Sequence, residues 1–86
     1  MADPHDPQPV RVAVIYEPEA AKPRPVWFEL RGEQIKIGEV CYFWRSWNGE
    51  AEILSYSVST AQGQFELSFN SKTHAWTAAD KSADTL

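Results

Sequence analysis

The sequence predicts an all-β fold, a small antiparallel meander of about five to six strands curled into an SH3-like barrel or a compact two-sheet sandwich. Short segments rich in β-branched and aromatic residues alternate with turns rich in glycine, proline or asparagine, and no segment has helical periodicity. The 86 residues suffice for one small domain. A single cysteine excludes an internal disulfide, so we expect the eleven aromatic residues to supply most of the core.

The first two predicted strands are separated by a proline-rich connection. Val10–Tyr16 is rich in β-branched residues and too short for a typical helix, which predicts a strand. Residues 17–25 include three prolines, which cannot donate hydrogen bonds to a sheet, so this stretch is predicted to connect two strands. Val26–Arg31 is the second predicted strand, and Gly32 follows it in a turn.

The third predicted strand, 34–47, contains a change of phase. Ile35 and Ile37 occupy odd positions, whereas the apolar residues after Gly38 fall at even positions, from Val40 to Trp44. One inserted residue at the Gly38–Glu39 step, a β-bulge, would let both sets point inward. A complete break between two strands would explain the pattern equally well.

The C-terminal half is predicted as three further strands joined by short turns. Asn48–Gly49 can supply the positive φ angles of a two-residue type I′ turn after Trp47. The strands that follow are expected at 50–60, at 64–70 and around Trp76. The alternation predicts an aromatic core made of Tyr16, Phe28, Tyr42, Trp44, Tyr56, Phe65, Phe69 and Trp76.

The apolar positions between residues 25 and 76 follow a recognisable order. They are Phe28, Leu30 and Gly32, then Ile37, Val40, Trp44 and Arg45, then Tyr56 and Val58, Phe65 and Leu67, and finally Trp76. This order resembles a family of small bacterial all-β domains of unknown function, to which this chain adds the Val10–Tyr16 strand. Members of the family often lie near translesion-polymerase-like genes. The resemblance implies the fold and a link to DNA damage tolerance, and it supplies no catalytic residue.

The charge is unevenly distributed along the chain. The whole sequence has a net charge of −4, but residues 10–79 hold seven basic and eight acidic side chains, a balance of −1. We expect a single β domain at 10–79, a flexible acidic tail at 1–9 and a second flexible tail at 80–86. Without a secretory signal or a long apolar run, and with a solitary cysteine, the chain is predicted to be cytoplasmic and to have no membrane contact.

The sequence offers no convincing catalytic set. Cys41 could act as a nucleophile with His74 as its base, but neither a helix N-terminus nor a sharp turn precedes the cysteine to lower its pKa. No glycine-rich phosphate loop is present, and two histidines with one cysteine make a zinc finger implausible. We therefore expect no enzyme, no cofactor and no metal site.

The most informative surface prediction concerns the side chains opposite the expected core. If even-numbered residues of the third strand point inward, odd-numbered ones point outward, and a neighbouring strand adds two more side chains. The predicted partner-binding residues are Trp27, Arg31, Phe43, Arg45 and Trp47. Aromatic and arginine side chains together favour a non-catalytic protein-interaction module, which includes self-association. The alternative is an accessory single-stranded nucleic-acid-binding domain, which the near-neutral charge does not support. A second layer covering these rings is a further alternative.

Overall fold

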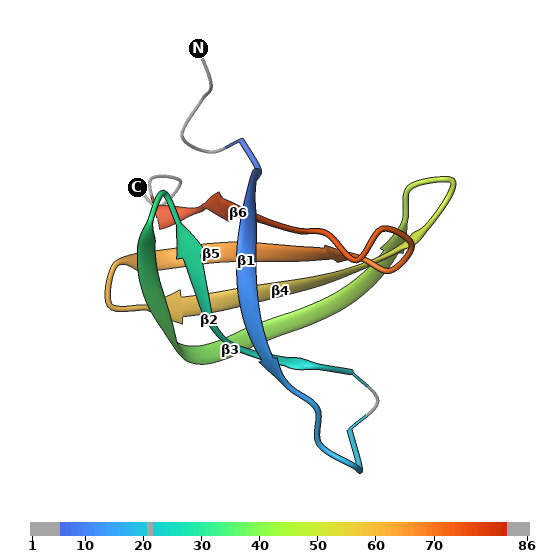
Figure 1. Ribbon diagram of the computed structural model, residues 1–86, viewed down its shortest axis with the longest axis horizontal. Helices are drawn as coiled ribbons and strands as arrows, with labels where there is room; N and C mark the ends of the chain where they lie inside the picture. Colours follow the sequence, from blue (N-terminus) through green and yellow to red (C-terminus); the bar gives the residue numbers. More distant parts are fainter. Residues whose placement is uncertain (1–5, 21, 83–86) are drawn as a thin grey trace.

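The computed structural model describes residues 6–20 and 22–82, and it is all-β. Six antiparallel strands follow one another in meander order and close into a six-stranded barrel (Figure 1). The strands are β1 (Gln8–Ile15), β2 (Arg24–Leu30), β3 (Glu33–Trp47), β4 (Glu52–Thr60), β5 (Gly63–Asn70) and β6 (Trp76–Asp80). Of the two architectures that the sequence left open, the barrel is therefore the correct one. The predicted tails lie partly outside the described residues, at 1–5 and 83–86, while β1 begins two residues before the predicted domain boundary.

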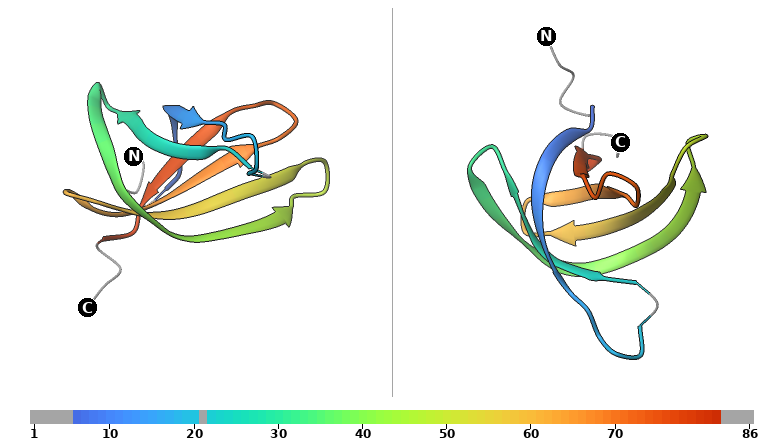
Figure 2. Two further views of the ribbon diagram at one scale, coloured as in Figure 1. Left: turned by 90° about the horizontal axis from the view of Figure 1, so that it is seen from below. Right: turned by 45° about the vertical axis from the view of Figure 1, so that its right-hand side comes forward.

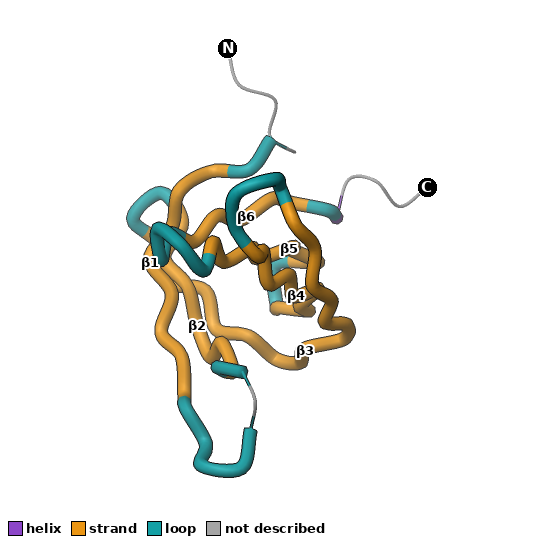
Figure 3. The backbone as a smooth tube through the Cα atoms, turned by 90° about the vertical axis from the view of Figure 1, so that its right-hand side faces the viewer, coloured by secondary structure: helices purple, strands orange, loops and turns teal. Residues whose placement is uncertain are grey.

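Closure of the barrel depends on β1, which pairs first with one neighbouring strand and then with another. Its first part, Gln8–Val10, pairs with β6, and its second part, Arg11–Ile15, pairs with β2. The hairpin of β1 and β2 consequently projects away from the other strands (Figure 3). This arrangement covers sheet edges that would otherwise expose unpaired backbone groups.

The core occupies the barrel interior and is built from alternate residues of the middle strands. The side chains of Phe28, Tyr56, Val58 and Leu67 are almost completely buried. The Phe28 ring meets Phe65 edge-on at 5.2 Å between centroids, a favourable arrangement for two aromatic rings. The burial predicted for Phe28, Tyr56 and Phe65 is confirmed.

Two of the hairpin turns show where local sequence rules succeed and fail. Arg31 and Gly32, with φ angles of 54° and 80°, form the two-residue connection between β2 and β3. The type I′ turn predicted at Asn48–Gly49 is wrong, because Asn48 does not have a positive φ and β4 begins only at Glu52. Instead, the Asn48 side chain caps a longer turn by accepting hydrogen bonds from two backbone N–H groups, at 3.1 and 2.9 Å.

Strand β3 contains two irregularities rather than one. The predicted bulge at Gly38 is confirmed by a register shift between Ile37 and Glu39 against β4. A second shift lies between Val40 and Tyr42, so Cys41 is an extra residue in this ladder. Because each inserted residue exchanges the two faces of a strand, the residues after Cys41 point opposite to the prediction.

The second bulge corrects the predicted core. Phe43, expected to face outward, packs against the core, with its ring 5.0 Å from that of Tyr56. Tyr42 and Trp44, expected inside, are 72% and 39% exposed. Tyr16 is also wrongly predicted, since it lies beyond the end of β1 and is 74% exposed. Phe69 and Trp76 are partly buried against the core, close to the expectation.

Candidate functional site on strand β3

Strand β3 changes its pairing partner along its length. It pairs with β2 along Glu33–Lys36 and with β4 from Ile37 to Trp47. Within the described part of the chain, no strand pairs with the other side of β3 beyond Lys36. The views in Figure 2 show β3 sweeping away from β2 towards its hairpin with β4. We call Cys41–Trp47 on this side the free edge of β3.

The separation of β2 from β3 has a local cause. The first residues of β2 include Pro25, which has no N–H to donate to a partner strand. Opposite them, the bulge at Gly38 bends β3. The two strands splay around an open pocket of about 440 Å³ lined by residues 24–26 and 36–40. In the register of this ladder, the positions opposite Cys41–Trp47 come before β2, which begins only at Arg24, so the edge has no partner strand there.

Large aromatic side chains are concentrated along the free edge. Tyr42 and Trp44 lie on the outer face of the barrel wall, with their rings in an edge-to-face contact at 6.5 Å. Trp47 lies at the end of the strand and is 71% exposed. These three residues are exposed although each could bury a large apolar area. The edge therefore offers both unpaired backbone groups and apolar rings.

The inner face of the same strand combines aromatic and cationic groups. The half-buried Phe43 ring has the Lys22 Nζ atom 4.6 Å and the Arg45 guanidinium carbon 5.5 Å from its centroid. Both distances fall within the range of cation–π attraction. In the ladder Arg45 lies opposite Leu54, a core residue. Arg45 itself is exposed, so its side chain extends from the core towards solvent.

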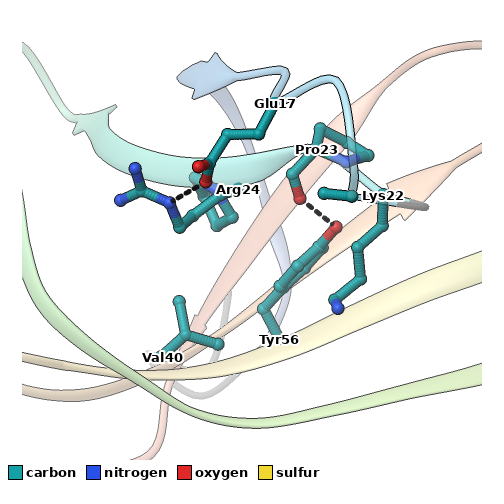
Figure 4. Close-up of a pocket in the computed structure, with 8 residues that line it drawn as sticks. Glu17, Lys22, Pro23, Arg24, Val40 and Tyr56 are labelled. Carbon is teal, nitrogen blue, oxygen red and sulfur yellow. Dashed lines mark hydrogen bonds and ion pairs between the residues drawn. The ribbon is translucent and has the colours of Figure 1, made fainter.

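A small pocket lies beside this inner face, under the segment that leads into β2 (Figure 4). Its volume is about 240 Å³. The Tyr56 hydroxyl donates a hydrogen bond to the Pro23 carbonyl oxygen at 2.7 Å, and Arg24 forms an ion pair with Glu17 at 3.1 Å. Burial raises the pKa of Tyr56 to about 12, although nearby Arg45 acts in the opposite direction. The tyrosine is therefore neutral at physiological pH and fastens the proline-rich segment to the barrel.

The two candidate catalytic residues, Cys41 and His74, occupy a strand bulge and an aromatic stack. Cys41 is exposed at the second bulge of β3. The His74 ring stacks almost parallel to that of Phe69, with centroids 5.8 Å apart. Residues 6–20 and 22–82 contain no group of three His, Cys, Asp or Glu side chains able to hold a metal ion. The same residues include no helix that is long and apolar enough to cross a membrane.

The five predicted partner-binding residues do not form one face. Trp27 is half-buried and pairs in the ladder with Ala13 and Lys36, near the other end of β3. Arg31 lies in the turn after β2 and donates a 3.4 Å hydrogen bond to the Gln8 side chain. Only three of the five share a face, and these are Phe43, Arg45 and Trp47 of β3. Tyr42 and Trp44, which the alternation of the sequence assigned to the core, are exposed on this strand and belong to the candidate site.

Comparisons of this chain with protein-family models, with curated proteins and with solved structures gave no match. The function of this chain is therefore inferred from the geometry of the barrel and of the free edge of β3.

Proposed function

We propose that this domain is a non-catalytic protein-interaction module that binds its partner along the free edge of β3. The observation that supports the proposal most directly is the distribution of exposed apolar side chains. Five large hydrophobic residues are prominently exposed in the described part of the chain, and three of them, Tyr42, Trp44 and Trp47, lie on this one edge. Exposed aromatic residues beside an arginine are typical of the side chains that contribute most to binding energy at interfaces.

The backbone of the free edge supports the same proposal. An unpaired strand can accept an extended segment as an additional strand, so that main-chain hydrogen bonds provide affinity and side chains provide specificity. Natural edge strands are usually protected by lysine, proline or a covering loop. Between Cys41 and Trp47 the only charged residue is Arg45, and no proline is present. Arg45 and the bulge at Cys41 are therefore the protective features within the edge.

The proposal is tested by capture from an extract of the source cells with Tyr42→Lys and a matched control. Tyr16 is as exposed as Tyr42, at 74% against 72%, but lies outside the edge. An untagged copy of this chain is added to the extract, and it counts as a bound protein if it is captured. Wild type and Tyr16→Lys should capture the same protein, whereas Tyr42→Lys should not capture it. Capture of nothing by the wild type, or equal capture by all three, would contradict the proposal.

Single-stranded nucleic acid is the second candidate, because two cationic side chains, Lys22 and Arg45, lie close to the Phe43 ring. A base could stack on an aromatic ring while cations contact phosphates. The family resemblance would connect such binding to DNA damage tolerance. Fluorescence anisotropy with a labelled single-stranded oligonucleotide tests this candidate. If it is correct, the affinity for the oligonucleotide should fall as the salt concentration rises and should also fall in the Arg45→Ala variant. The −1 balance of residues 10–79 favours the protein partner instead.

A further inference from the structure

We propose that the partner of the free edge of β3 is a second copy of this chain, which pairs with it antiparallel about a two-fold axis centred on Trp44. Two barrels would then share one continuous sheet. This inference rests on the proposed function, because it names the occupant of the same edge. It also fixes a register, which makes it testable residue by residue.

The geometry of the edge restricts the possible registers. The ladder between β3 and β4 is regular from Tyr42 to Trp47, so side chains alternate between the outer and the inner face over these six positions. Residues directly opposite each other in an antiparallel pair point to the same face. A two-fold symmetric pair must therefore be centred on a residue, and the central candidates in this segment are Phe43, Trp44 and Arg45.

Side-chain chemistry selects among the three registers. Centring on Arg45 would place two like charges directly opposite each other, which is unfavourable. Centring on Phe43 would pair only residues 42–44 within the regular segment and would place Arg45 opposite the irregular residue Cys41. Centring on Trp44 pairs residues 42–46 and leaves only Trp47 opposite Cys41. Centring on Trp44 places the two Trp44 rings together on the outer face and Tyr42 opposite Ser46. On the inner face it sets Arg45 of each copy opposite Phe43 of the other, a favourable cation–π pair.

Charge and area are compatible with this symmetric partner. Residues 10–79 have a net charge of only −1, so two copies repel each other weakly. The exposed fractions of Tyr42, Trp44 and Trp47 correspond to roughly 350 Å² of aromatic residue surface per copy, or about 700 Å² for two copies. Interfaces at the low end of the size range are weak, so we expect a dissociation constant on the order of micromolar.

Disulfide trapping tests the register. In a Cys41→Ser background, Trp44→Cys places two cysteines directly opposite, with Cα atoms about 4.5–5.5 Å apart, within the reach of a disulfide. Ser46→Cys in the same background is the matched control, because its two copies would be about 13 Å apart along the strands. Under mild oxidation we expect a covalent dimer for Trp44→Cys only. A covalent dimer of Ser46→Cys, or none of Trp44→Cys, would overturn the inference.

Sedimentation equilibrium of the untagged chain, from micromolar to millimolar concentration, tests the self-association itself. The wild type and Tyr16→Lys should dimerise with increasing concentration, whereas Trp44→Lys should remain monomeric because it sets two lysines opposite each other. If circular dichroism shows that Trp44→Lys does not fold, the comparison of Trp44→Cys with Ser46→Cys decides whether the chain self-associates in this register. A wild type that stays monomeric at every concentration overturns the second copy as partner. The proposed function would survive that result if another protein were still captured by wild type and lost with Tyr42→Lys.

Discussion

Replacing Tyr56 with phenylalanine removes the hydroxyl that fastens the proline-rich segment to the barrel. The ring of Tyr56 is 1% exposed and stays buried in the variant, so the substitution changes a hydrogen bond and leaves the packing volume nearly unchanged. The lost bond is the 2.7 Å contact from the hydroxyl to the Pro23 carbonyl oxygen. Pro23 is partly exposed, so water can take the place of the hydroxyl. We therefore expect the free energy of unfolding at neutral pH to fall by about 1 kcal/mol.

At alkaline pH we expect the same substitution to stabilise the protein relative to wild type, the opposite of its effect at neutral pH. The pKa of Tyr56 is raised in the folded state from 10.0 to about 12, mainly by burial. The unfolded chain therefore loses its Tyr56 proton at a lower pH than the folded chain. The contribution of the protonated Tyr56 hydroxyl to the free energy of unfolding is fully present below about pH 10 and is lost as the pH rises to about 12. Over that interval the wild type should lose about 2 to 3 kcal/mol that Tyr56→Phe does not lose. The variant should become the more stable protein slightly below about pH 11.

Urea unfolding of both proteins at a series of pH values from neutral to about 12 measures this difference directly. All other titrating groups are shared, so subtracting the two curves isolates Tyr56. Near neutral pH, the melting temperature of the variant should be lower by about 4–8 °C. A difference between wild type and variant that stays constant across the alkaline range would refute the reasoning. So would a variant that is more stable than the wild type at neutral pH.

Two turns supply further predictions, each measured by urea unfolding. Gly63→Ala should cost roughly 1–3 kcal/mol, because φ is +116° and a Cβ atom would collide with the Ser82 side chain. Gly49→Ala is its matched control, with φ of +97° and open space around the added atom, so it should cost less; an equal loss would contradict the role of Ser82. Asn48→Ala should cost about 1 kcal/mol, since the side chain accepts hydrogen bonds from two backbone N–H groups. Unchanged stability of this variant would show that the cap contributes nothing.

The strands were predictable where apolar and polar residues alternate in a single phase. Phe65, Leu67 and the intervening polar residues define β5 to within one residue of its observed start. The phase change across Gly38 likewise predicted the first bulge of β3. In both places only one face of the strand is consistently apolar, so the sequence alone specifies which side is buried.

The second bulge was not predictable, and it decided the candidate site. Val40–Trp44 is an uninterrupted run of apolar residues, so both possible phases place large side chains inward. The structure inserts Cys41 and brings Phe43 into contact with Tyr56, which leaves Tyr42 and Trp44 outside. For this reason the five predicted partner-binding residues do not share one face. A second reason is that strand order alone does not show how far apart two residues lie along neighbouring strands. The ladder pairs Trp27 with Lys36, at the opposite end of β3 from Trp47.

The amino-acid sequence by itself determined that this protein is an all-β domain with short turns, an aromatic core and an almost neutral body. These properties follow from local alternation, from turn residues and from composition, which need no knowledge of distant contacts. Only the tertiary structure decided that β1 closes a barrel and that β2 departs from β3 after Lys36. Which edge stays unpaired depends on where two strands distant in sequence separate, and the free edge of β3 is therefore a property of the folded chain.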